Sequence, residues 1–215
     1  RCSRDWSSDV CSSDLIGTDT IQIITDPVYA FIGEPGNHKV HVYVLSVSGI
    51  TYKFVQTIDN GLMATDLFGC SLSLNSNASK FLIGASNKDS KGKVYFGSRS
   101  GADKYSQTHN ITASLAGINI GDNLGNSVQL TRDGSIAFIA AYRSSPTQNG
   151  KVYVVRFSDQ TILQTLASPD NLTNQQFGYH ISLSINSNKL AVASIQSQNK
   201  NVINFDSAKT TFDNK

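Results

Sequence analysis

The sequence predicts an all-β fold, a β-propeller of about four repeats, each a four-stranded antiparallel blade of roughly 54 residues. Glycines at positions 17, 69, 125 and 178 are 52, 56 and 53 residues apart. Valines at positions 40, 94, 152 and 202 are 54, 58 and 50 residues apart. Gln–Thr pairs begin at positions 56, 107 and 164, so they are 51 and 57 residues apart. Three independent landmarks therefore share one period.

Composition excludes several classes of function. The chain has 215 residues, enough for one sizeable domain. Charged residues make up 16%, below the roughly 25% of ordinary domains. The net charge of +2 is too small to favour nucleic acid or an anionic membrane surface. No apolar run approaches the ~18 residues of a transmembrane helix, so none is expected.

Residues 1–15 are expected to lie outside the fold. The run from Asp5 to Leu15 resembles a translated sequencing adapter and has no apolar stretch of the kind found in signal peptides. Without this leader, which we expect to be disordered, Cys70 is the only cysteine. The sequence therefore predicts no disulfide framework, and the repeats at 16–215 are expected to be a fragment whose natural ends, targeting signal and source are unknown.

The first repeat, residues 16–60, reads as a meander of four strands. Alternating apolar and polar residues and β-branched side chains mark the strands, and Pro, Gly, Asn and Ser mark the turns between them. The predicted strands are 20–25, 28–33, 39–47 and 52–58.

The second repeat, residues 66–115, begins at a Phe–Gly pair and contains an unbroken apolar strand at 81–85, as expected where both faces are buried. Residues 93–96 and 105–113 complete its blade. The third repeat, residues 122–168, has strands at 127–130, 136–141 and 161–166, and its 150–153 segment repeats 92–95 letter for letter.

The fourth repeat, residues 175–215, is predicted to be incomplete. Strands are expected at 181–185, 190–194 and 202–205, and the chain then ends where a fourth strand would start.

The residues that recur between repeats are assigned to packing. Glycine lets neighbouring backbones approach closely, and an aromatic side chain beside it can wedge between sheets. The residues assigned to this structural motif are Phe68, Gly69, Gly84, Gly92, Val94, Tyr95, Gly125, Gly150, Val152, Tyr153, Phe177 and Gly178.

The pattern FG…LSL…FLIGAS…GKVYFG resembles the FG-GAP repeat of the integrin α-subunit β-propeller. Leu124 before Gly125, and Ala140 in place of Gly84, depart from that pattern. The resemblance implies a propeller that commonly has seven blades, of which four repeats would be about half. A closed ring of four blades is the alternative.

No cofactor is expected. Members of that family often bind Ca²⁺ through an acidic loop between the first and second strands, because hard cations need several oxygen ligands. The corresponding turns here, near positions 75–80, 131–135 and 186–189, offer one carboxylate, Asp133. Asp133–Gly134 is itself a turn signal, so Asp133 is interpreted as a turn former and no metal site is predicted.

No catalytic constellation is recognised in the sequence. His38, His41, His109 and His180 occupy non-equivalent positions in the repeats and are interpreted as packing or solvated residues. Nucleophile-elbow, zinc-protease and phosphate-loop motifs are absent from the sequence. The sequence therefore favours a protein that is not an enzyme.

Function is predicted to lie in loops on one face of the propeller. The resemblance implies a non-catalytic, extracellular or cell-surface module that binds a protein or glycan. The alternatives are a propeller accessory to an enzyme whose catalytic part is missing, and a purely structural spacer. The candidate ligand-contacting residues are Asn87, Lys88, Asp89, Tyr142, Arg143, Gln196 and Gln198. Glycosylation sequons at Asn77, Asn110 and Asn171 do not discriminate between these alternatives.

Overall fold

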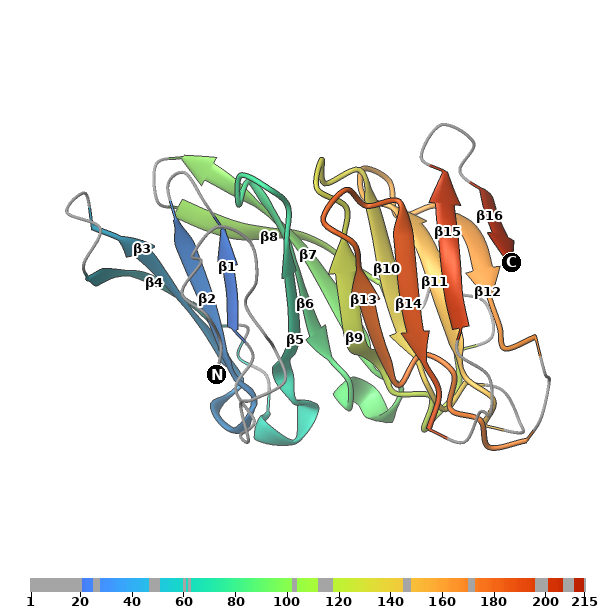
Figure 1. The fold of residues 1–215 in the computed structure, drawn as a ribbon. Coiled ribbons are helices and arrows are strands. Elements are labelled where there is room, and N and C mark those ends of the chain that lie inside the picture. Colours follow the sequence, from blue (N-terminus) through green and yellow to red (C-terminus); the bar gives the residue numbers. More distant parts are fainter. Residues whose placement is uncertain are drawn as a thin grey trace, which may run out of the picture.

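The computed structural model describes residues 21–24, 28–46, 51–59, 61, 63–101, 104–111, 118–144, 148–169, 173–195, 201–206 and 211–214. Within these residues the strands form four sheets, each of four antiparallel strands in sequence order. Figure 1 shows the sheets following one another in a row. The all-β prediction of four-stranded antiparallel blades is confirmed.

The first two sheets follow the predicted meanders closely. The first contains β1 (Ile21–Ile24), β2 (Tyr29–Glu34), β3 (Lys39–Leu45) and β4 (Tyr52–Asp59). The second contains β5 (Phe68–Leu74), β6 (Lys80–Ala85), β7 (Lys93–Gly101) and β8 (Lys104–Ile111). Three short 3₁₀ turns in the connections were not predicted: η1 (Pro35–Asn37), η2 (Ala64–Asp66) and η3 (Lys88–Ser90).

The third sheet contains β9 (Leu124–Leu130), β10 (Ile136–Ala141), β11 (Lys151–Arg156) and β12 (Ile162–Leu166). The fourth contains β13 (His180–Leu183), β14 (Lys189–Ala193), β15 (Asn201–Asp206) and β16 (Thr211–Asn214). The prediction that the fourth blade lacks its last strand is therefore wrong. Thr211–Asn214 pairs in antiparallel fashion with β15, with Phe212 opposite Phe205.

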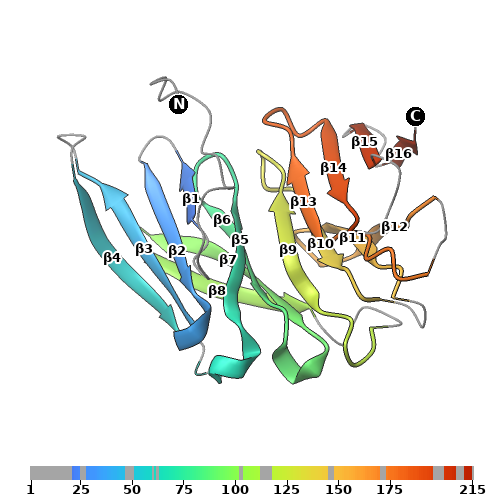
Figure 2. The same ribbon diagram turned by 60° about the horizontal axis from the view of Figure 1, so that its bottom comes forward.

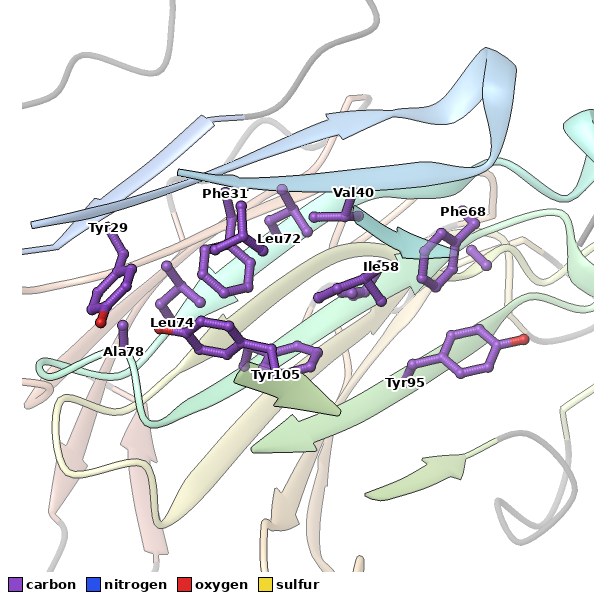
Figure 3. Packing of buried hydrophobic residues seen from close by; sticks show 14 residues of the cluster. Tyr29, Phe31, Val40, Ile58, Phe68, Leu72, Leu74, Ala78, Tyr95 and Tyr105 are labelled. Carbon is purple, nitrogen blue, oxygen red and sulfur yellow. The ribbon is translucent and has the colours of Figure 1, made fainter. Parts of the chain in front are cut away.

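The hydrophobic core is divided into layers between consecutive sheets. One cluster lies between the first and second sheets, another between the second and third, and another between the third and fourth. Figure 3 shows the first layer, in which Phe31, Phe68 and Tyr105 lie among branched aliphatic side chains. Burying a large apolar side chain stabilises by about 1.5–3 kcal/mol, so each layer holds its two sheets together.

Serine hydroxyls link the first strands of the second, third and fourth sheets. Ser71 Oγ donates to the carbonyl of Gly125 at 2.7 Å, and Ser73 Oγ accepts from the amide of Leu130 at 2.8 Å. Ser127 Oγ accepts from the amide of Ile181 at 3.1 Å, one repeat later. These bonds join β5 to β9 and β9 to β13 without a continuous sheet. The first strand of the second, third and fourth sheets is therefore the strand through which these sheets approach one another.

The glycine that follows the phenylalanine or leucine at the start of a repeat also packs as predicted. A Cβ on Gly125 would lie 2.7 Å from the Lys93 carbonyl oxygen, and one on Gly69 would lie 3.1 Å from the Lys39 carbonyl oxygen. Both glycines have positive φ angles, 84° and 90°. Phe68, Leu124 and Phe177 are completely buried beside these contacts.

The row of sheets is open. The main contacts between sheets join consecutive ones. Figures 1 and 2 place the first sheet and the fourth at opposite ends of the row. The described part of the chain therefore does not form the closed four-bladed ring considered as an alternative. No helix in these residues is long and apolar enough to cross a membrane.

Candidate functional site

The connections between β2 and β3, β4 and β5, and β6 and β7 gather at one face, the lower edge in Figure 1. Their 3₁₀ turns contact in series, η1 with η2 and η2 with η3. We call this surface the loop face. The sequence predicted that the candidate ligand-contacting residues would lie in such connections.

Asn87, Lys88 and Asp89 lie at the loop face, but their contacts close the loop. Lys88 Nζ lies 3.1 Å from Asp89 Oδ1 and 3.4 Å from Oδ2 of the buried Asp66. The hydrogen bond to Asp89 raises the pKa of Lys88. Asn87 Nδ2 donates to the Thr65 carbonyl at 2.7 Å. These partners connect η3 to η2, so this cluster stabilises the loop more than it presents free groups to a ligand.

Asp66 and its counterpart Asp122 cap the turns that lead into β5 and β9. Asp66 Oδ2 accepts from the Met63 amide at 3.1 Å, and Asp122 Oδ2 accepts from the Asn119 amide at 2.7 Å. Burial, and then the charges of Asp66 and Asp89, raises the pKa of Tyr95 to about 12. Tyr95 therefore remains protonated and packs beneath the turn, as its assignment to the structural motif predicts.

Tyr142 and Arg143 meet a third residue that the sequence did not single out. The ring of Tyr142 lies 5.3 Å from that of Tyr179, centroid to centroid, with the planes at 88°. The Arg143 guanidinium lies over the Tyr142 ring at 5.3 Å. The predicted candidates Gln196 and Gln198 fall outside the described residues.

A hydrogen-bonded chain of three side chains lies on the first sheet. Glu34 Oε2 lies 3.0 Å from His41 Nε2, and His41 Nδ1 lies 3.1 Å from Thr57 Oγ1. The residues come from the adjacent strands β2, β3 and β4, where His41 is the cross-strand partner of both Ile32 and Thr57. All three side chains therefore share one face of the sheet. We call this group the relay.

The relay can transfer a proton. A carboxylate only accepts hydrogen bonds, so Nε2 of His41 carries the hydrogen that Glu34 accepts. Nδ1 is then free to accept the hydroxyl hydrogen of Thr57. Hydrogen bonds from His41 and then from Asn37 lower the pKa of Glu34, so its carboxyl stays ionised at neutral pH. Carboxylate, imidazole and hydroxyl in this order are the groups used in nucleophilic acyl transfer.

The sequence interpretation of His41 as a packing or solvated residue did not identify these two hydrogen-bond partners. The signal that could have found these partners is the register in which β2, β3 and β4 pair. Glu34 and His41 lie on the two strands of the β2–β3 hairpin, and His41 is directly opposite Thr57 where β3 pairs with β4. A comparison of histidines alone could not reveal partners of other residue types.

Asp133 lies in the β9–β10 turn, as predicted. Its carboxylate accepts hydrogen bonds from the hydroxyl of Thr131 at 2.6 Å and from the amide of Ser135 at 3.0 Å. Among the described residues, no cluster of three or more His, Cys, Asp or Glu side chains could hold a metal ion. The absence of a calcium site therefore stays a prediction, which calorimetry with Ca²⁺ would test.

Comparison with family models and with curated protein sequences finds no match to this chain. Solved structures match it at low sequence identity. A candidate 6-phosphogluconolactonase from Bacteroides uniformis has a TM-score of 0.62 and 13% identity, with 91% of this chain and 54% of that chain covered. One from Bacteroides fragilis has a TM-score of 0.61 and 11% identity, with 91% and 52% covered.

A functionally unknown protein from Desulfotomaculum acetoxidans has a TM-score of 0.61 and 20% identity, with 91% of this chain and 54% of that chain covered. This chain therefore spans about half the length of these structures. At such identities the matches show the fold alone, and that fold is propeller-like.

These matches overturn the expectation of a non-catalytic binding module and the preference against an enzyme. The same arrangement of sheets occurs in proteins described as candidate lactone hydrolases, so this fold gives no reason to exclude catalysis. Neither the FG-GAP resemblance itself nor the localisation is tested by the matches, and both stay predictions.

Proposed function

We propose that this chain belongs to an ester hydrolase of propeller fold that opens sugar lactones. The observation that carries the proposal is the relay of Glu34, His41 and Thr57. The description of two matched structures as candidate 6-phosphogluconolactonases supports the substrate class, because a lactone is a cyclic ester.

In this mechanism Thr57 is the nucleophile. Its Oγ1 attacks the lactone carbonyl carbon as His41 Nδ1 takes the hydroxyl proton. The ring C–O bond breaks, and His41 returns the proton to the leaving oxygen, which gives an open-chain acyl ester on Thr57. Water then attacks that ester, and its proton passes through His41 back to Thr57. Glu34 stays ionised and holds the imidazole, so the reaction as proposed uses no cofactor.

The reaction can be followed as acid release from glucono-δ-lactone in a pH-stat, corrected for the spontaneous rate. We expect His41→Gln and Thr57→Val to lower kcat/KM by about 100-fold or more, the usual range for general base catalysis. His180→Gln, which changes an exposed histidine outside the relay, should leave the rate unchanged. Equal rates in all variants, or no acceleration by the unaltered chain, would contradict the proposal.

Acyl transfer has a second signature. An activated acetyl ester such as p-nitrophenyl acetate should add one acetyl group to the intact protein, placed on Thr57 by peptide mass spectrometry. Thr57→Val should remain unmodified. Acetylation confined to lysine side chains would argue against Thr57 as the nucleophile.

We also infer that the four sheets are part of a larger propeller. The chain covers about half of each matched structure. The face of the first sheet that carries the relay also leaves Tyr52 and Phe54 exposed, at 43% and 52%. The equivalent faces of the second and third sheets are buried against a preceding sheet. Because Glu34 ends β2 and Thr57 lies two residues from the end of β4, a further blade would leave the relay near the loop face.

A further inference from the structure

Tyr142, Arg143 and Tyr179 form a group that the repeat itself does not explain; we call it the tyrosine–arginine site. Tyr142 follows the last residue of β10, and Ser86 holds the same place after β6. Tyr179 follows Phe177–Gly178, where the two preceding repeats have Cys70 and Asn126. If both rings served the packing between sheets, aromatic side chains would recur at these places, as tyrosine does at 95 and 153.

The backbone of Tyr179 and Arg143 is held in place, while their side chains remain open to solvent. The Tyr179 amide donates to the Gln176 and Ala193 carbonyls at 3.0 and 3.1 Å, and Asn126 Nδ2 donates to the Tyr179 carbonyl at 2.8 Å. The Arg143 amide donates to the Asp122 carbonyl at 3.3 Å. Nevertheless Tyr179 is 45% exposed, Arg143 is exposed and Tyr142 is half-buried.

Arg143 is available to bind an anion. Lys88 and Arg156 pair with carboxylates, but no ion pair joins the Arg143 guanidinium to any of the residues that the structure describes. Its neighbour is the Tyr142 ring, a cation–π contact that positions the guanidinium without neutralising it. A planar guanidinium recognises carboxylate and phosphate groups through two parallel hydrogen bonds.

We propose that the tyrosine–arginine site binds a monosaccharide that carries an anionic group. The exposed Tyr179 ring packs against the apolar C–H face of the sugar, and Arg143 pairs with its carboxylate or phosphate. The site lies where the third and fourth sheets meet, since β9 and β13 are neighbours (Figure 2). The relay lies on the first sheet, at the other end of the row (Figures 1 and 2), so this is a second binding site, separate from the proposed lactone-opening site. The inference therefore goes beyond the proposed function.

Titration calorimetry with three sugars tests the site without any turnover: gluconate for the carboxylate, glucose 6-phosphate for the phosphate, and glucose as the neutral reference. We expect at least one anionic sugar to bind more tightly than glucose. Arg143→Met should weaken that anionic sugar on the order of tenfold and leave glucose unchanged. Tyr179→Ala should weaken all three by about fivefold, and Tyr179→Phe should restore glucose binding.

The matched controls are Tyr52→Ala, an exposed tyrosine on β4, and Arg132→Gln, an exposed arginine in the β9–β10 turn. Neither should change any affinity. Loss of binding in the controls, or wild-type affinity in Arg143→Met, would overturn the inference. Lactone hydrolysis without binding of any of these sugars would overturn this inference alone, whereas binding without hydrolysis would leave it standing and remove the proposed function.

Discussion

The side-chain amide of Gln56 forms two hydrogen bonds with the backbone of Tyr105. Its Nε2 donates to the Tyr105 carbonyl at 2.8 Å, and its Oε1 accepts from the Tyr105 amide at 2.9 Å. Gln56 lies in β4 and Tyr105 in β8, the last strands of the first and second sheets. Because an amide side chain offers the same donor and acceptor as a peptide group, it joins two sheets that have no ladder between them.

Replacing Gln56 with alanine should therefore loosen the first sheet from the second. We expect Gln56→Ala to lower the free energy of unfolding by about 1–3 kcal/mol, because it leaves the amide and carbonyl of Tyr105 without these partners. Urea unfolding followed by circular dichroism measures the change. Lys53→Ala, at an exposed position of the same strand, should stay within about 0.5 kcal/mol of the unaltered chain. Similar losses in both variants would show that the bridge is not the cause.

Gly84 should tolerate no side chain at all. A Cβ there would lie 2.0 Å from the Gly125 carbonyl oxygen and 2.2 Å from Ser71 Oγ. Gly84→Ala must therefore displace β9 or break the serine bond, and we expect a loss of about 3 kcal/mol or more in thermal or urea unfolding. Gly36→Ala, where nothing lies within 4 Å, is the matched control and should cost little. A stable Gly84→Ala chain would mean that the sheets can separate at low cost.

The Asp133 carboxyl should make stability depend on pH at the acidic end. Although burial opposes it, hydrogen bonds from Thr131 and Ser135 lower the pKa of Asp133 below its ordinary value of 3.8. A lowered folded pKa stabilises the fold above the ordinary value, and this contribution is lost as pH falls through the folded pKa. Asp133→Asn should then cost about 0.5 kcal/mol at neutral pH, since the carboxylate is exposed, and progressively less as pH falls from the ordinary value through the folded pKa. A constant difference across this range would contradict the assignment.

The fold could be predicted from the sequence because its signals recur. Phe68, Gly69 and Tyr95 have counterparts one repeat later, so each copy tests the interpretation of the others. Departures were harder to interpret. Ala140 replaces Gly84, yet its Cβ lies 3.3 Å from where a Cβ on Gly178 would be, so this junction has room for the methyl group. The β16 strand was missed because Thr211–Asn214 carries few apolar residues.

Little of the candidate site could be predicted, since it depends on register and on contacts between repeats. Tyr142 and Arg143 were singled out, but Tyr179 is 36 residues beyond Arg143 and approaches only because β9 and β13 are neighbours. In the sequence, Glu34 follows a predicted strand and Thr57 lies within one, and neither carries a sign of a functional role. Only the pairing of β2 with β3 and β3 with β4 brings both to His41.

Glu34 should act through His41 and not on the substrate. Glu34→Gln keeps the shape of the side chain but can no longer stabilise the imidazolium that forms during acyl transfer. We expect kcat for lactone hydrolysis to fall by about tenfold or more while KM changes little, because substrate binding does not use this group. Lys104→Gln, at an exposed position in the second sheet, should leave both constants unchanged. A rise in KM with constant kcat would instead place Glu34 in substrate binding.

The outward face of the first sheet should drive association of the isolated chain. Phe54 is 52% exposed and packs edge-to-face with Tyr43 at 5.7 Å, and Tyr52 beside them is 43% exposed. Exposed apolar patches of this kind mark surfaces that are normally covered. Size-exclusion chromatography with light scattering should show a mass that rises with concentration, and Phe54→Ser should reduce it. Lys53→Ser, on the same strand, is the control. A monomer at all concentrations would contradict the inference that a further blade covers this face.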